Sequence, residues 1–267
     1  SPAAPVILTH AVEEWPAMGC RRWSSEYLRR KAGTRLVPVE TCAEAESSRG
    51  YLSSSWERKV MSLAEYIDTY VEQGKAQDDG GVSHGGEAVG GERGYLAQYQ
   101  LFDQIPSLRE DIEIPPLCAA HLPEDEAAPA ECERRPGDKP LISAWFGPSG
   151  SVSPLHYDPF HNLLVQVVGY KYVRIYDAEH NRSLYPREGS LCNNSQVSLD
   201  EPQPQAFPLF EETPFHQCLL GPGEALYIPR HAWHYVRSLQ TSFSVSFWWG
   251  AKMGLRPKAG GGVQSFY

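Results

Sequence analysis

The second half of this chain is a series of short apolar runs separated by turns. From Leu141 onward, runs of β-branched and aromatic residues alternate with Gly, Pro and Asn, which favour turns. No long helical segment interrupts them, so we expect an all-β sandwich or barrel. The predicted strands are Ile142–Phe146, Ser153–His156, Leu163–Val168, Tyr172–Tyr176, a segment near Cys218–Leu220, Ala225–Ile228, His234–Arg237 and Ser242–Trp249.

The first 140 residues have a mixed character and should pack on this β core as part of one domain spanning residues 1–267. Cap and periodicity signals predict helices that are decorated by a few strands. The expected elements are a strand at Pro5–Leu8, a helix at Glu26–Ala32 ended by Gly33, a strand at Leu36–Glu40 and a helix from Ser62 to about Gln73.

Two irregular stretches interrupt the N-terminal part. Gly74–Gly94 is Gly-rich, polar and without periodicity, which indicates an exposed, mobile loop. Pro115–Pro140 is rich in Pro, Ala and Glu and indicates a second surface insertion. The β core is expected to occupy 141–250, and residues 251–267 to form a flexible tail.

The charge and the cysteines limit the partners and the compartment. The formal net charge of −9 argues against nucleic-acid binding through a broad basic face, and suits a basic protein or peptide better. No apolar run reaches transmembrane length, so no membrane partner is expected. The six cysteines are scattered without a C-x-x-C pair, which predicts free thiols in the nucleus or cytoplasm.

His156-Tyr157-Asp158 is the first candidate for metal chemistry. On a strand, residues i and i+2 project from the same face, so His156 and Asp158 can converge on one ion. Such a triplet can also arise by chance, as polar residues at a strand end. His234, on a later predicted strand, completes a set of two histidines and one aspartate. That set leaves three positions open on Fe(II).

A lysine near this set suggests an anionic co-substrate. Lys171 begins a predicted strand, and a lysine inside a β-barrel is costly unless it meets an anion. The distal carboxylate of 2-oxoglutarate is such an anion. Ser153 and Tyr95 could add hydroxyl donors, and Asn162 could orient a ligand of the metal. Alternatively, Lys171 and Asn162 are ordinary turn residues.

Several stretches of the chain resemble the jumonji-C family. They are SAWFGPSGSVSPLHYDPFHNLLVQVVGYKYVRIY, LYP, NNSQV, PGEALYIPRHAWHYV and SFSVSFWW. Within this family the chain is most similar to the jumonji-domain protein 5 type, because GYLAQYQLFDQIPSL and LVPVE are also present. The resemblance runs from Pro5 to Trp249, and the two irregular stretches fall outside its motifs.

The resemblance implies a double-stranded β-helix (a jelly-roll, cupin-like core) with N-terminal helices packed on it. It implies a 2-oxoglutarate-dependent dioxygenase that uses Fe(II), 2-oxoglutarate and O2. The implied iron ligands are His156, Asp158 and His234. The implied 2-oxoglutarate contacts are Lys171, Tyr95, Ser153 and Asn162. Trp248 could wall the same pocket, although a core tryptophan is the simpler interpretation.

Family members of this type are described as arginyl C3 hydroxylases and as histone lysine demethylases. The substrate pocket of the former corresponds here to Glu40, Tyr51, Trp56, Gln98 and Trp145. Glu40 could bind a guanidinium while an aromatic ring stacks on it, but the same set could enclose a methylated ammonium. A plainer interpretation makes the aromatic residues core residues and Glu40 a solvated strand end.

Arginyl hydroxylation of a protein substrate is therefore the preferred prediction. N-methyl-lysine demethylation, with a histone as the candidate substrate, is the first alternative. A non-catalytic peptide- or chromatin-binding module is the second. A cupin-type enzyme that does not use 2-oxoglutarate would leave Lys171 unexplained.

Overall fold

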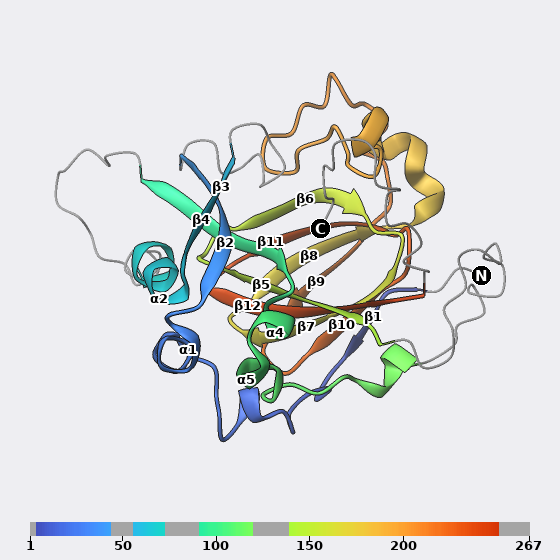
Figure 1. Cartoon of the computed structure of the whole chain (residues 1–267). Helices are drawn as coiled ribbons and strands as arrows, with labels where there is room; N and C mark the ends of the chain where they lie inside the picture. Colours follow the sequence, from blue (N-terminus) through green and yellow to red (C-terminus); the bar gives the residue numbers. More distant parts are fainter. Residues whose placement is uncertain (1–3, 44–55, 73–90, 120–138, 251–267) are drawn as a thin grey trace, which may run out of the picture.

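The computed structural model of this protein describes residues 4–43, 56–72, 91–119 and 139–250 (Figure 1). These residues form a larger antiparallel sheet of order β1-β10-β7-β12-β5-β4-β2-β3 and a smaller one of order β6-β11-β8-β9. The strands are β1 Val6–Leu8, β2 Leu36–Ala43, β3 Glu57–Ser62, β4 Glu92–Tyr99, β5 Leu141–Gly147, β6 Val152–Tyr157, β7 His161–Val168, β8 Lys171–Tyr176, β9 His216–Leu220, β10 Ala225–Ile228, β11 Trp233–Ser238 and β12 Ser242–Trp249.

The strands from β5 to β12 alternate between the two sheets, except that the consecutive strands β8 and β9 both lie in the smaller one. β5, β7, β10 and β12 belong to the larger sheet, while β6, β8, β9 and β11 belong to the smaller one. This alternation is the arrangement of a jelly roll, or double-stranded β-helix. All eight strands predicted from the second half of the sequence are observed, with bounds that agree within two residues.

Apolar side chains from both sheets fill the space between them. Leu164 on β7 and Leu226 on β10 pack with Val173, Ile175 and Val236 from the smaller sheet, and all five are buried. Burial of apolar surface on both inner faces is the main force that holds a two-sheet structure together.

The larger sheet has a hydrophobic core on each of its two faces, one between the two sheets and one under the N-terminal elements, and strand β12 contributes to the second. Phe243 and Phe247 face the N-terminal elements, where the Phe243 ring lies 4.4 Å from that of Trp23. Because side chains alternate along a strand, Ser244 and Ser246 point to the opposite side. Both serines are buried there: the Ser246 hydroxyl accepts a hydrogen bond from the Trp145 indole at 2.9 Å, and the Ser244 hydroxyl donates to Gln166 at 2.7 Å.

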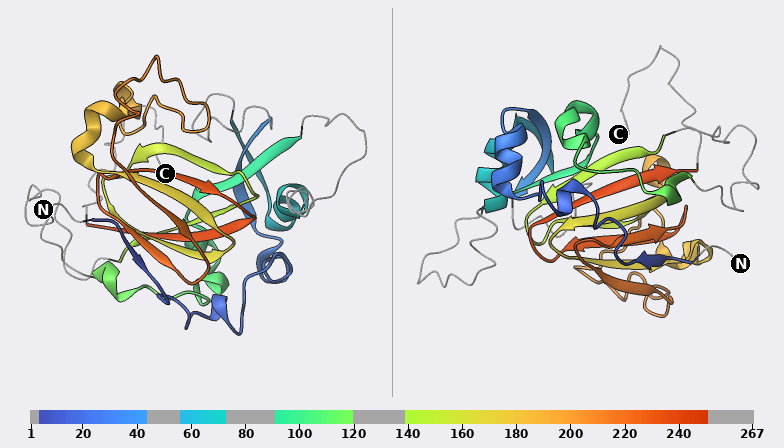
Figure 2. Two further views of the ribbon diagram at one scale, coloured as in Figure 1. Left: turned by 180° about the vertical axis from the view of Figure 1, so that it is seen from behind. Right: turned by 90° about the horizontal axis from the view of Figure 1, so that it is seen from below.

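The N-terminal helices gather beside β2, β3 and β4 (Figures 1 and 2). The Ser24 hydroxyl accepts the backbone N–H of Tyr27 and caps the first helix, and Ser62 does the same for Glu65. Both predicted helices are confirmed, the second with a π-helical continuation. The helical segments are α1 Ser25–Ala32, α2 Leu63–Tyr66, the π-helix η3 Ile67–Val71, α4 Leu101–Gln104, α5 Pro106–Arg109, and the 3-10 turns η1 Pro16–Met18, η4 Pro116–Ala119, η6 Ala178–Leu184 and η7 Gly189–Leu191.

A buried carboxylate ties the N-terminal elements together. Asp111 is fully buried and accepts hydrogen bonds from the Trp23 indole at 3.1 Å and the Tyr27 hydroxyl at 2.7 Å. The Arg21 guanidinium, 3.1 Å away, supplies the compensating charge. A buried carboxylate is tolerated only with such partners.

Strands β3 and β4 were not predicted, and part of one prediction is wrong. Residues 92–94 were expected in the mobile loop Gly74–Gly94, but they form the start of β4 and pair with β2. The pairing is tertiary, and the Tyr70 hydroxyl and the Lys59 ammonium also hold the Glu92 carboxylate. The rest of that loop (73–90), most of Pro115–Pro140 (120–138) and the tail 251–267 lie outside the described residues.

Within the described residues, no helix has the length and hydropathy needed to cross a membrane. Five cysteines fall in this part of the chain and are free thiols, as the sequence predicted: Cys20, Cys42, Cys118, Cys192 and Cys218.

Candidate metal and co-substrate site

Two strands of the smaller sheet bring His156, Asp158 and His234 together. β6 and β11 pair antiparallel with His156 directly opposite His234, so their rings lie on one face with centroids 4.3 Å apart. Asp158 follows β6 on the same side, with Oδ2 3.7 Å from Nε2 of His234. One potential ligand atom from each residue lies within 4.8 Å of the others.

Hydrogen bonds to the backbone set the orientation of both imidazoles. Nδ1 of His156 donates to the Pro154 carbonyl at 2.7 Å, and Nδ1 of His234 donates to the Ala232 carbonyl at 3.0 Å. Each ring therefore presents its Nε2 to the space beside Asp158. Metal-bound histidines are fixed in the same way by a partner on their other nitrogen.

Burial favours the uncharged forms of both His234 and Asp158, and only for His234 is this the form that binds a metal. Burial and the neighbouring His156 lower the pKa of His234 to about 3, so its contact with Asp158 is not an ion pair at neutral pH. Burial raises the pKa of the Asp158 carboxyl, and His156 opposes this rise. A divalent cation would favour both the neutral imidazole and the carboxylate. Two imidazoles and one carboxylate fit Fe(II).

The segment after β6 is held in place by backbone contacts. The His231 N–H donates to the Asp158 carbonyl at 2.8 Å from a turn in which His231 has a φ of 63°. On the other side, the Tyr157 N–H donates to the Asn193 carbonyl at 2.9 Å. These two tethers fix where the Asp158 carboxylate points.

Lys171 lies at the start of β8, as predicted, and its side chain is 2% exposed. Among the described residues it makes no hydrogen bond or ion pair, and burial lowers its pKa to about 7. The turn before it depends on Gly169, whose φ of +71° favours glycine and where a Cβ atom would lie 2.2 Å from the Thr241 carbonyl oxygen. A buried ammonium in this state suits an anionic ligand.

Other polar groups predicted for the co-substrate are also buried. Tyr95 on β4 is hydrogen-bonded to Ser153 on β6. Asn162 on β7 has a buried Oδ1 without a hydrogen-bond partner in the described part of the chain. A ligand with carboxylate and oxo groups would use these hydroxyls and a cation at Lys171, so the residues fit 2-oxoglutarate.

An aromatic cluster stands beside these groups. Trp145 lies between Tyr95 and Trp248, with ring centroids at 6.2 and 6.3 Å, and Phe160 stacks on Trp248 at 6.2 Å. Trp56 packs against the cluster, and its buried Nε1 has no partner among the described residues. Trp248 is thus a buried core residue of this cluster, in agreement with the simpler interpretation of the sequence, and its role as a wall of the co-substrate pocket stays a prediction.

The predicted substrate residues are distributed around this cluster. Glu40 on β2 is the cross-strand neighbour of Tyr95, and its carboxylate binds the guanidinium of Arg58. Gln98 lies at an irregularity of β4 with a φ of 49° and lines a cavity of about 120 Å³ together with Trp248. Tyr51 lies outside the described residues.

Three residues near the site were missed by sequence reasoning. Phe160 lies within the HYDPFHN segment, so its place beside the iron motif was a usable signal. Arg58 could not be found, because β3 itself was not predicted. His231 contributes through its backbone N–H, which binds the Asp158 carbonyl. Such a contact does not depend on the side chain, so the residue type could not indicate it.

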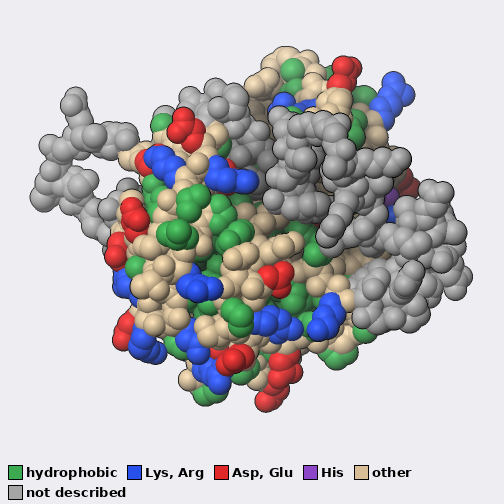
Figure 3. Space-filling view, viewed as in Figure 1, with side chains coloured by type: hydrophobic (Ala, Val, Ile, Leu, Met, Phe, Trp, Pro, Cys, Tyr) green, Lys and Arg blue, Asp and Glu red, His purple; other side chains and the backbone are tan. Residues whose placement is uncertain are grey.

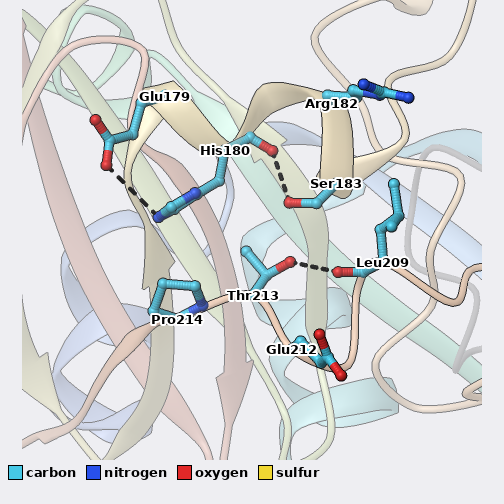
Figure 4. Close-up of a pocket in the computed structure, with 8 residues that line it drawn as sticks. All are labelled: Glu179, His180, Arg182, Ser183, Leu209, Glu212, Thr213 and Pro214. Atoms are coloured by element: carbon cyan, nitrogen blue, oxygen red, sulfur yellow. Dashed lines mark hydrogen bonds and ion pairs between the residues drawn. The ribbon is translucent and has the colours of Figure 1, made fainter.

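A second cavity, of about 430 Å³, lies in the long connection between β8 and β9 (Figure 4). His180 and Glu179 face each other at 3.8 Å on one wall, and Thr213 donates to the Leu209 carbonyl on another. None of the residues predicted for metal, co-substrate or substrate lines it. Its other lining residues are Arg182, Ser183, Glu212 and Pro214.

The surface drawn in Figure 3 carries both signs of charge. Lys and Arg side chains are interspersed with Asp and Glu on this face of the molecule. Such a surface does not resemble the continuous basic stripe of a nucleic-acid interface.

Comparison with known proteins agrees with this geometry. The family described as "Cupin-like domain" matches residues 1–254. "Lysine-specific demethylase 8" of Danio rerio is 43% identical over 249 residues, which cover 93% of this chain and 53% of that protein. "Lysine-specific demethylase JMJ30" of Arabidopsis thaliana is 40% identical over 93% of this chain and 50% of that protein. "Jumonji C domain-containing protein 5" of Drosophila melanogaster is 37% identical over 92% of this chain and 54% of that protein.

The chain thus spans about half the length of these relatives. The comparisons confirm the resemblance seen in the sequence, and they indicate a 2-oxoglutarate- and iron-dependent oxygenase domain. This chain belongs to the cupin-like domain family and has the jumonji-C form of that fold.

Proposed function

We propose that this domain hydroxylates C3 of an arginyl side chain in a protein substrate, using Fe(II), 2-oxoglutarate and O2. The observation that carries the choice of arginine is the contact of Glu40 with Arg58. The Glu40 carboxylate, 14% exposed, already holds a guanidinium at 2.6 and 2.7 Å. The position therefore has the geometry for the group that distinguishes arginine from lysine.

The role of the protein in the reaction is to bind and orient the metal, the co-substrate and the substrate. When bound, iron, 2-oxoglutarate and O2 together supply the oxidation: one oxygen atom enters the substrate C–H bond and the other enters succinate, with release of CO2. In the proposed site His156, Asp158 and His234 hold the metal. Lys171 pairs with the distal carboxylate of 2-oxoglutarate, where its ammonium is the form that binds.

The polar groups beside the metal would fix the co-substrate. The Tyr95 and Ser153 hydroxyls, already hydrogen-bonded to each other, can donate to the carboxylate that meets Lys171. The Asn162 carboxamide lies beside Trp248 across paired strands and can orient a metal-bound group. The buried rings of Trp145 and Trp248 exclude water, which strengthens each of these interactions.

N-methyl-lysine demethylation is the second candidate. It is favoured by the names of two relatives, which are described as lysine-specific demethylases. The aromatic residues Trp56 and Trp145 could also contact a methylated ammonium. Hydroxylation of the N-methyl group would give a hemiaminal that releases formaldehyde, so the same site chemistry would serve both reactions.

Mass spectrometry of substrate peptides decides between the two. The iron-loaded protein is incubated with 2-oxoglutarate and matched peptides, including histone sequences, that carry arginine, lysine or trimethyl-lysine at one position. We expect a gain of one oxygen on arginine, and no product with Asp158→Asn. Loss of a methyl group with formaldehyde would instead support demethylation. If no basic peptide stimulates consumption of 2-oxoglutarate, the protein is a binding module and the proposal is wrong.

A further inference from the structure

Arg58 binds the Glu40 carboxylate, which in the proposed function binds the guanidinium of the substrate. Its Nε lies 2.7 Å and its Nη2 2.6 Å from Oε1 of Glu40. Arg58 itself is 60% exposed, whereas Glu40 is 14% exposed. A carboxylate this far from water needs a cation, and in the described residues Arg58 supplies it.

The strand register places this pair in line with the site. Arg58 on β3 is directly opposite Glu40 on β2, and Glu40 is directly opposite Tyr95 on β4. Directly opposed residues project from the same face of a sheet. Tyr95 in turn is hydrogen-bonded to Ser153, three residues before His156. The row Arg58, Glu40, Tyr95 therefore leads from the edge strand to the metal side of the fold.

A second guanidinium cannot take Glu40 in its best geometry while Arg58 is in place. A bidentate guanidinium pair uses both oxygens of a carboxylate, and both Arg58 contacts are made to Oε1. Two guanidinium groups on one carboxylate would also repel each other. The substrate must displace Arg58 or accept a weaker contact.

We propose that Arg58 is an internal competitor of the substrate guanidinium and that it sets the affinity of the site for arginine. This inference rests on the proposed function. Arg58 keeps Glu40 neutralised until an arginine side chain replaces it, and a neutral or short side chain does not provide the charge to do so. Because exposed ion pairs are weak, the competition is moderate: its removal should strengthen arginine binding by about two- to fivefold.

Arg58→Gln tests this competition, with Lys59→Gln as a matched control. Both residues lie on β3 and each change removes one positive charge. Lys59 pairs instead with Glu92, and as the next residue along the strand it points to the other face. Proteins loaded with Mn(II) and 2-oxoglutarate are titrated calorimetrically with the peptide acetyl-Gly-Ala-Arg-Ala-Gly-amide and with its citrulline counterpart.

We expect the Kd of the arginine peptide to fall by about two- to fivefold in Arg58→Gln and to stay unchanged in Lys59→Gln. The Kd of the arginine peptide in Arg58→Lys should lie between those of Arg58→Gln and the wild type, because lysine keeps the charge but cannot donate two parallel hydrogen bonds as a guanidinium does. The citrulline peptide should not respond to any of these changes. Thermal melting of each variant verifies that the fold is retained.

An unchanged or larger Kd in Arg58→Gln would overturn the inference, since Arg58 would then not compete with the substrate. An equal gain in Lys59→Gln would overturn it as well, because the effect would be one of overall charge. Failure of the proposed function looks different: the wild type and Arg58→Gln would both leave arginine peptides unmodified while a methyl-lysine peptide lost its methyl group.

Discussion

Replacing Lys171 with methionine should stabilise the protein without ligand while it destroys the co-substrate site. The Lys171 side chain is 2% exposed, and no described residue pairs with it. Methionine has a similar volume and fills the same space without a charge. The two effects have one cause: a buried ammonium binds an anionic co-substrate, but it destabilises the folded protein when no anion is bound.

The pKa of Lys171 gives the magnitude. Burial lowers this pKa from 10.5 to about 7. At about 1.4 kcal/mol per pKa unit, the charged Lys171 lowers the free energy of unfolding by up to about 5 kcal/mol. Between these two values the unfolded chain binds more protons than the folded one, so the stability of the wild type rises with pH. The cost is fully present below about pH 7 and disappears as the pH approaches 10.5.

Urea unfolding of the wild type and Lys171→Met at pH 7.5 and 9.5 measures this cost. Lys171→Met should be more stable by several kcal/mol at pH 7.5, and the difference should shrink by about 1.4 kcal/mol per pH unit. Lys139→Met, a change at an exposed lysine, should show neither effect. In Mn(II)-loaded protein the Kd for 2-oxoglutarate should rise by about ten- to a hundredfold in Lys171→Met. A wild type more stable than Lys171→Met at both pH values would refute the argument.

Three further changes test other parts of the structure. Asp158→Asn keeps the shape but removes the anionic ligand, so metal retained after dialysis, measured by elemental mass spectrometry, should drop to background. Asp111→Asn breaks a buried charged network and should lower the free energy of unfolding by about 3 kcal/mol or more in urea titrations. Gly169→Ala puts a Cβ atom 2.2 Å from the Thr241 carbonyl at a φ of +71°, so unfolding should become easier by about 1–3 kcal/mol and the KM for 2-oxoglutarate should rise.

The β core was predictable because its strands carry their own pattern. The run Ser242–Trp249 alternates serine with large apolar residues, and each set faces a different side of the sheet. The short turns at Gly169 and Gly223 need a positive φ. Glycine is the residue that adopts it readily, so these turns can be recognised in the sequence. Local chemistry was sufficient for these elements, and the observed strands agree with the predicted ones.

The residues of the candidate metal site could be named from the sequence for the same reason, but their arrangement could not be predicted. A spacing of two residues on a strand places His156 and Asp158 on one side, whatever lies around them. That His234 faces His156 depends on the pairing of β6 with β11, and the resemblance to a family supplied this information. The β4 strand escaped prediction because Glu92 and Gly94 are typical of loops and pair only through β2.

The contact between Glu40 and Arg58 depends on register alone. The segment ERKVMS has four exposed residues in succession, so it shows no alternation that would indicate a strand. A slip of one residue between β2 and β3 would bring Lys59 opposite Glu40 and turn Arg58 to the other face. The positive charge would remain, but the guanidinium fork would be replaced by a point charge. The contact of this carboxylate with a guanidinium is therefore a property of how two strands align, and the spacing of charged residues along the sequence does not determine it.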